Sequence, residues 1–172
     1  MCGIVGYIGK KCNLKKVLID DLKTLEYRGY DSSGIAIFDG NMKIIKAKGK
    51  IKNLEESLKK IDIKNSELGI AHTRWATHGE ANDINSHPHR VGCVTLVHNG
   101  IIENYVELKD DLIKKGYHFV SDTDTEVVSA LLDDIKKKEK DNIKAINKLT
   151  LVLEGSYALG IIFDDDYEHL YA

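Results

Sequence analysis

The chain has 172 residues, of which 42% are hydrophobic and 30% charged, and its formal net charge is −2. These values are ordinary for one globular domain and give no reason to expect a nucleic acid or a membrane as partner. No apolar run approaches a membrane span, no signal peptide is recognisable, and three widely spaced cysteines are typical of a reducing compartment, so we expect a single cytoplasmic domain over residues 1–172.

Apolar periodicity predicts the secondary structure. Leucine and valine recur at steps of three and four after residue 12, which is typical of a helix, and Asp39-Gly40-Asn41 is a typical hairpin turn. In chain order we expect a strand at 3–9, a helix at 12–26, paired strands at 34–38 and 42–48, a helix at 52–60, strands at 68–74 and 93–98, helices at 104–116, from 123 onward and at about 141–153, and strands at 157–163 and 170–172.

Helix starts can be predicted from capping residues. Asn104 and Thr123 are each followed three residues later by glutamate, as in a capping box. In the last helix we expect an inward stripe that includes Ile143 and Leu149. Strands and helices in mixed order, with hairpins, predict an α+β fold in which helices cover sheets, rather than a doubly wound sheet.

Cys2 is the residue with the clearest chemical meaning. An initiator methionine is generally removed when the next side chain is small, which would leave Cys2 with a free α-amine. Such an amine has a pKa of about 7.7–8.0. It can accept the thiol proton, so one residue would supply nucleophile and base. The alternative is a small buried cysteine in an N-terminal strand.

Histidines are concentrated between residues 72 and 98, which hold five of the seven in the chain. Their spacings match no common zinc motif, so we expect hydrogen-bonded loop histidines, with a catalytic metal as the alternative. No phosphate-binding or dinucleotide-binding motif occurs, and no cofactor is predicted.

Two short segments supply groups that bind a carboxylate or an oxyanion. The guanidinium of Arg74, beside Trp75, can bind a carboxylate with two hydrogen bonds; the alternative is a surface ion pair with a stacked tryptophan. Asn99 and Gly100 follow a buried strand, where a side-chain amide and a backbone N–H can hold a developing oxyanion. The alternative is a simple Asn-Gly turn.

The remaining candidates are acidic or basic. Asp122 or Asp124 can hold a substrate ammonium, although helix capping also explains both. Arg28 and Asp31 either order the N-terminus or pair with each other. A thiol nucleophile, an oxyanion hole, a carboxylate clamp and an ammonium acceptor are the parts needed to hydrolyse the side-chain amide of an amino acid.

Six motifs occur in an order that resembles a known family. The chain resembles the glutaminase domains of the glucosamine-6-phosphate synthases, also called glutamine–fructose-6-phosphate aminotransferases. These domains are class II glutamine amidotransferases with the N-terminal nucleophile hydrolase fold, a four-layer αββα sandwich with two stacked antiparallel sheets. The motifs are CGIVG at 2–6, LEYRGYDSSG at 25–34, GIAHTRWATHG at 69–79, HPH at 87–89, HNGIIEN at 98–104 and TDTE at 123–126.

The resemblance implies a role for each candidate residue and a partner for the domain. Ammonia would pass to an isomerase domain of the parent chain, expected to be a homodimer, and the present chain is expected to be a truncated part of it. Another class II amidotransferase, or a non-catalytic domain of the same fold, is the alternative. The implied roles are Cys2 as nucleophile, Asn99 and Gly100 as oxyanion hole, Arg74 and Asp124 as partners of the glutamine carboxylate and ammonium, Thr77 and His78 as further glutamine contacts, Trp75 at the mouth of an ammonia channel, and Arg28 as support for the N-terminal residue.

Overall fold

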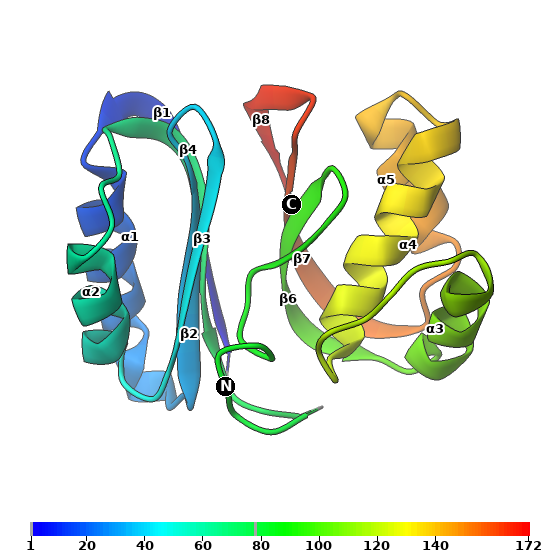
Figure 1. Cartoon of the computed structure of the whole chain (residues 1–172), viewed down its shortest axis with the longest axis horizontal. Helices are drawn as coiled ribbons and strands as arrows, with labels where there is room; N and C mark the ends of the chain where they lie inside the picture. The colour runs from blue at the N-terminus through cyan, green and yellow to red at the C-terminus, as the bar shows by residue number, and fades with distance from the viewer. Residues whose placement is uncertain (1, 78) are drawn as a thin grey trace.

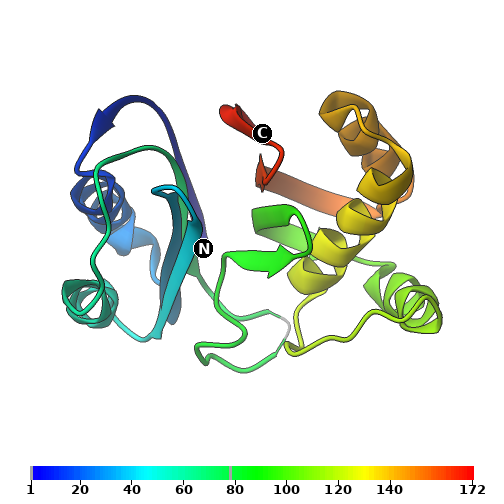
Figure 2. The same cartoon turned by 45° about the horizontal axis from the view of Figure 1, so that its top comes forward.

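Two antiparallel sheets of four strands face each other, and helices cover their outer faces (Figures 1 and 2). The computed structural model describes residues 2–77 and 79–172. Its elements are β1 (Gly3–Cys12), α1 (Leu14–Thr24), the 3-10 turn η1 (Glu26–Arg28), β2 (Ser32–Phe38), β3 (Met42–Lys48), α2 (Ile51–Lys59), β4 (Ser66–Arg74), β5 (His89–Val91), β6 (Val94–Ile102), α3 (Tyr105–Lys114), α4 (Asp124–Lys138), α5 (Asn142–Thr150), β7 (Gly155–Phe163) and β8 (Asp166–Tyr171).

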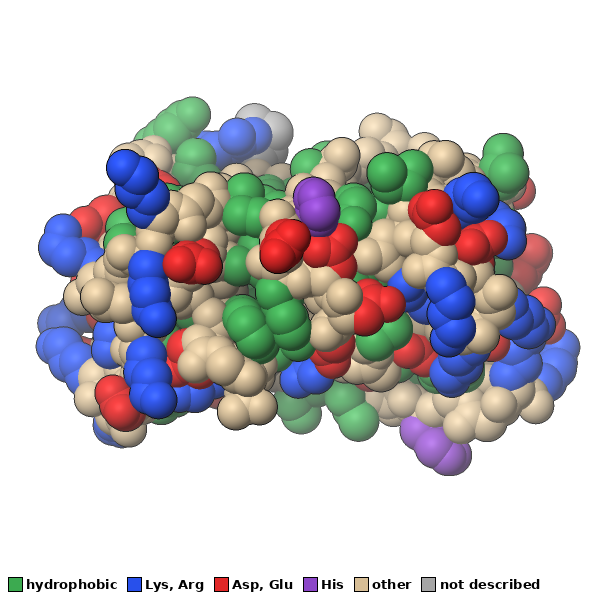
Figure 3. Space-filling model, turned by 90° about the horizontal axis from the view of Figure 1, so that it is seen from above, with side chains coloured by type: hydrophobic (Ala, Val, Ile, Leu, Met, Phe, Trp, Pro, Cys, Tyr) green, Lys and Arg blue, Asp and Glu red, His purple; other side chains and the backbone are tan. Residues whose placement is uncertain are grey.

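The layers follow from where apolar side chains gather. The first sheet has the order β1-β4-β2-β3 and the second β5-β6-β7-β8. One apolar cluster lies between α1, α2 and the first sheet, another between α3–α5 and the second sheet, and a smaller one between the two sheets. The predicted α+β, four-layer sandwich is therefore confirmed. Lysine and arginine side chains gather over the helical layers at both ends of the molecule (Figure 3).

Side-chain alternation in β4 directs two polar residues into the space between the sheets. Ile70 belongs to the cluster between the sheets, whereas Ala71 faces the helices α1 and α2. Because successive side chains in a strand point to opposite faces, His72 and Arg74 continue the inner face beyond Ile70. The apolar part of β4 thus fixes the direction of its polar end.

The same alternation separates two neighbours in β6. Val97 lies in the cluster between the sheets and Leu96 in the cluster under the helices. Asn99 therefore faces the first sheet, and His98 faces α4, where its Nδ1 lies 3.0 Å from Thr125 Oγ1. The strand β6 therefore presents one polar side chain to the first sheet and the next to α4.

Gly34 in β2 allows the chain after β4 to pack directly on the first sheet. A Cβ atom placed at Gly34 would lie 2.1 Å from the backbone oxygen of His87. No side chain fits at that distance, so any other residue at position 34 would displace the segment that carries His87.

Three sequence-based expectations were wrong in detail. The short strand β5 was not predicted. The side chain of Asn104 does not cap α3; its Nδ2 donates to Val152 O at 2.8 Å, and its Oδ1 accepts from Glu154 N at 3.1 Å, because backbone groups distant in sequence compete for it. Ile143 is 62% exposed, since α5 buries only a narrow stripe. The Thr123 cap is confirmed: its Oγ1 accepts from Glu126 N at 3.3 Å.

No helix within the described residues is both long and apolar enough to cross a membrane.

Candidate active site

A cavity of about 480 Å³ opens where the start of β1, the ends of β4 and β6 and the start of α4 meet. It brings together every predicted site residue except His78, which lies outside the described residues. Five further residues line it, from the segment before β5, from β6 and from the start of α4; the sequence pointed to the histidines and to the helix cap among them without assigning them to the site. The cavity is lined by Cys2, Arg28, Arg74, Trp75, Thr77, His87, His98, Asn99, Gly100, Ile101, Thr123, Asp124 and Thr125.

Cys2 directly precedes β1, and its thiol contacts the segment that follows β4. The backbone N–H of Trp75 donates to Cys2 Sγ at 3.2 Å. On its other side the Cys2 thiol lies 3.6 Å from the backbone oxygen of Trp75, so the main chain of Trp75 holds the sulfur in place. The segment is held in turn by Asp31, whose Oδ2 accepts from Ala76 N at 2.5 Å. Asp31 thus positions the main chain beside the thiol rather than the thiol itself.

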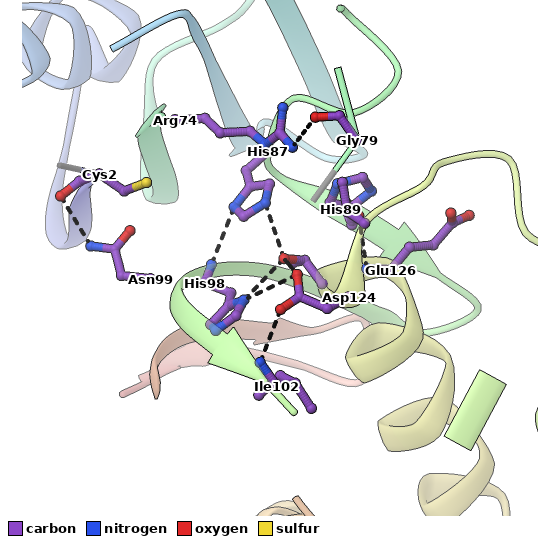
Figure 4. A network of polar contacts seen from close by, with 12 residues as sticks. Cys2, Arg74, Gly79, His87, His89, His98, Asn99, Ile102, Asp124 and Glu126 are labelled. Atoms are coloured by element: carbon purple, nitrogen blue, oxygen red, sulfur yellow. Dashed lines mark hydrogen bonds and ion pairs between the residues drawn. The ribbon is translucent and has the colours of Figure 1, made fainter. Parts of the chain in front are cut away.

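Asn99 lies opposite Cys2, and its amide nitrogen faces the backbone oxygen of Cys2 (Figure 4). Its Nδ2 donates to the backbone oxygen of Cys2 at 3.3 Å, and its Oδ1 lies 2.7 Å from His72 Nε2. Gly100 follows with φ +130°, and a Cβ there would lie 2.0 Å from Ser156 O in β7. Position 100 is therefore restricted to glycine by both conformation and space.

Arg74 is 3% exposed, in contrast to the surface ion pair considered as its alternative. Its guanidinium donates to Gly79 O at 3.1 Å and to Glu80 O at 3.4 Å, which fixes its direction (Figure 4). Burial lowers the pKa of Arg74, and the nearby carboxylates of Asp31 and Asp124 only partly oppose this effect. The neighbouring Trp75 is 54% exposed at the cavity edge.

Asp124 is the aspartate that lines the cavity. It is the first residue of α4, where a carboxylate is favoured by the helix dipole, and it is 4% exposed. Its Oδ2 accepts from Ile102 N at 3.0 Å (Figure 4). Asp122 is exposed instead and accepts from Asn85 Nδ2 at 3.2 Å.

Four buried histidines, His72, His87, His89 and His98, form a cluster of stacked and hydrogen-bonded rings, of which His87 and His98 line the cavity. The rings of His72 and His87 stack with centroids 4.2 Å apart, and His98 N donates to His87 Nδ1 at 3.4 Å. Burial lowers the pKa of His72 to about 3, and those of His87 and His89 well below their ordinary value. These three rings are therefore neutral at physiological pH.

The cluster differs from the sequence-based expectation in the location of one histidine. His72 and His98 lie in β4 and β6, where strands were expected, whereas His89, expected in a loop, lies in the short strand β5. The sequence showed that histidines are dense in this segment, but it did not indicate which rings would be in contact. Across residues 2–77 and 79–172, no group of three histidine, cysteine or acidic side chains is arranged to hold a metal ion.

Comparisons with known proteins agree with this geometry. The profile of a family described as "Glutamine amidotransferase domain" matches residues 72–172. Two relatives are named glutamine–fructose-6-phosphate aminotransferase (isomerizing). The one from Helicobacter pylori is 48% identical over 99% of this chain and 29% of its own length. The one from Caldanaerobacter subterraneus is 51% identical over 100% of this chain and 28% of its own length.

A solved structure shares the fold as well. Glutamine phosphoribosylpyrophosphate amidotransferase from B. subtilis, complexed with ADP and GMP, superposes with a TM-score of 0.78 and 26% identity over 95% of this chain and 35% of that chain. The order of strands, the cavity at the start of β1 and these matches lead to one conclusion. The chain belongs to the class II glutamine amidotransferase domain family.

Proposed function

We propose that the chain, once Cys2 is its first residue, hydrolyses the side-chain amide of L-glutamine to glutamate and ammonia. The observation that carries the proposal is one cavity lined by the Cys2 thiol, the Asn99 amide, the Arg74 guanidinium and the Asp124 carboxylate. The two charged groups are complementary to the α-carboxylate and α-ammonium of an amino acid, which would place its side-chain amide near the thiol.

The reaction needs two steps on Cys2. In the first, the α-amine of Cys2 takes the thiol proton and the sulfur attacks the amide carbon, while Asn99 Nδ2 and the Gly100 N–H hold the oxyanion. The protonated α-amine then gives its proton to the departing nitrogen, so the C–N bond breaks and ammonia leaves a γ-glutamyl thioester. In the second step, water attacks the thioester carbonyl, the same amine takes a proton from it, and glutamate and the free thiol are released.

The larger protein's reaction is a further proposal. The chain spans 28–29% of the length of the two aminotransferases compared above. We propose that it supplies ammonia to an isomerase domain of a longer chain, which converts fructose 6-phosphate to glucosamine 6-phosphate. Thr77 and His78 would contact glutamine, Trp75 would border the ammonia exit and Arg28 would support the N-terminal residue. A homodimeric parent and a cytoplasmic location stay predictions.

The glutaminase proposal can be tested by incubating the chain, shown by intact mass to lack Met1, with L-glutamine. We expect glutamate and ammonia in equal amounts, insensitive to chelators, and a covalent γ-glutamyl adduct on Cys2 when the reaction is quenched with acid. Binding of glutamine without any release of glutamate would favour the non-catalytic alternative.

Replacing Arg74 with alanine should raise the KM for glutamine by roughly tenfold to a hundredfold, because hydrogen bonds to charged groups contribute about 1.5–3 kcal/mol. Steady-state kinetics measure this effect. The matched control is Arg90→Ala, since Arg90 is partly exposed and pairs with Asp164 outside the cavity. An unchanged KM in Arg74→Ala would remove Arg74 from the carboxylate site.

A further inference from the structure

The amide of Asn99 has two possible orientations, related by a half-turn about its last side-chain bond. One end of the amide lies 3.3 Å from the backbone oxygen of Cys2, just before β1, and the other end lies 2.7 Å from His72 Nε2 in β4. A carbonyl oxygen can only accept, so the Asn99 atom facing Cys2 O must be the nitrogen. The Asn99 oxygen then faces His72.

This orientation determines the tautomer of His72. The Asn99 oxygen accepts a hydrogen bond, so His72 Nε2 must carry a hydrogen and donate it. Burial lowers the pKa of His72 to about 3, which keeps the ring neutral with one N–H at physiological pH. In the described residues His72 Nδ1 has no hydrogen-bond partner, in keeping with a ring whose single N–H is on Nε2.

The ring of His72 is itself fixed. It is fully buried, lies on the inner face of β4 and stacks on the ring of His87, with the two ring centroids 4.2 Å apart. His87 is held by a hydrogen bond from His98 N to its Nδ1 and by Thr125 Oγ1, 3.0 Å from its Nε2. The donor therefore sits on a rigid support formed by both sheets and by α4.

We propose that His72 is a positioning residue, which holds the Asn99 amide with its nitrogen toward Cys2 and the cavity. Of the two N–H groups of that nitrogen, one donates to Cys2 O and the other is directed to the reacting carbonyl. Without the His72 donor, the amide can turn over and present its oxygen to the developing oxyanion, which repels it. The role rests on the proposed function, because it acts on the oxyanion of glutamine hydrolysis.

The experiment compares kcat and KM for glutamine in His72→Phe, which keeps a stacking ring without a donor, and His72→Gln, whose amide can donate from a similar position. Loss of one oxyanion donor costs about 100- to 1000-fold in kcat. We expect His72→Phe to lower kcat by at least about tenfold with KM within about threefold, and His72→Gln to recover most of that loss. His89→Phe removes a buried histidine of the same cluster, and should keep kcat within about threefold if it folds.

A double mutant separates positioning from general damage. In the Asn99→Ala background, adding His72→Phe should change kcat by less than about twofold, because the group that His72 orients is gone. Equal losses in the Phe and Gln variants, additive losses in the double mutant, or wild-type kcat in His72→Phe would each overturn the role. If His72→Phe does not fold, His72→Gln still tests the role. The single variant must keep kcat within about fivefold of wild type. Combined with Asn99→Ala, it must keep kcat within about fivefold of Asn99→Ala. A wild-type chain without glutaminase activity would instead overturn the proposed function, and this role with it.

Discussion

Cys2→Ala should abolish glutamate release while the fold persists. The proposal uses the Cys2 thiol as its nucleophile. In a Ser-His-Asp protease, removing the nucleophile costs about six orders of magnitude in kcat. Alanine is also small, so the initiator methionine is removed from this variant too and the α-amine is retained. The substitution thus tests the thiol and not the processing of the chain.

The control for this variant is a second cysteine. Burial, followed by the charge of Asp133, raises the pKa of Cys93 to about 11, so its thiol is protonated at neutral pH and Cys93→Ala should keep activity. Turnover of glutamine is measured for both, and circular dichroism checks the fold. Normal turnover in Cys2→Ala would contradict the whole mechanism. A wild-type chain that retains Met1 should be as inactive as Cys2→Ala, because its amine is acylated.

The buried histidine cluster should make the fold sensitive to acid. Burial lowers the pKa of His72 to about 3, and those of His87 and His89 well below the ordinary value. Below pH 6.5 the unfolded chain binds protons at these positions more readily than the folded chain, so stability falls as pH falls. Each histidine contributes about 1.4 kcal/mol per pH unit, hence roughly 4 kcal/mol per unit for three.

Domains typically have an unfolding free energy of about 5–15 kcal/mol, so a loss of roughly 4 kcal/mol per pH unit below pH 6.5 predicts unfolding between about pH 5 and about pH 3. Urea titrations from pH 7 to 4.5 measure the slope. His89→Gln should lower the slope of unfolding free energy against pH by the contribution of one histidine. An unfolding free energy that stays constant over this range would contradict the prediction.

The sequence was sufficient for the residues whose chemistry is local. Cys2, Arg74, Asn99 and Asp124 each stood at a strand end or helix start that apolar periodicity could place, and the cavity contains all four. Periodicity also placed β2, β3, β4 and β7 within two residues of their bounds, whereas β1 and β6 end later and β8 begins earlier than expected, and β5 was not expected.

Contacts between the sheets could not be predicted in this way. His72 and Asn99 lie on β4 and β6, in different sheets, and only the stacking of those sheets brings them to 2.7 Å. Asn104 was assigned a local cap but binds backbone 48 and 50 residues away. Such contacts depend on tertiary packing, which the hydrophobic periodicity of the sequence does not predict.

The pairing of β1 with β4 makes the spacing between Cys2 and the strand part of the geometry of the site. Gly3 pairs with Thr73 and Ile4 with His72, so Cys2 shares the inner face with Ile4. One codon inserted between Cys2 and Gly3 would move the thiol along the strand by about 3.3 Å and turn it to the opposite face, toward the helices. The number of residues between the Cys2 thiol and β1 is therefore restricted as strictly as their identity.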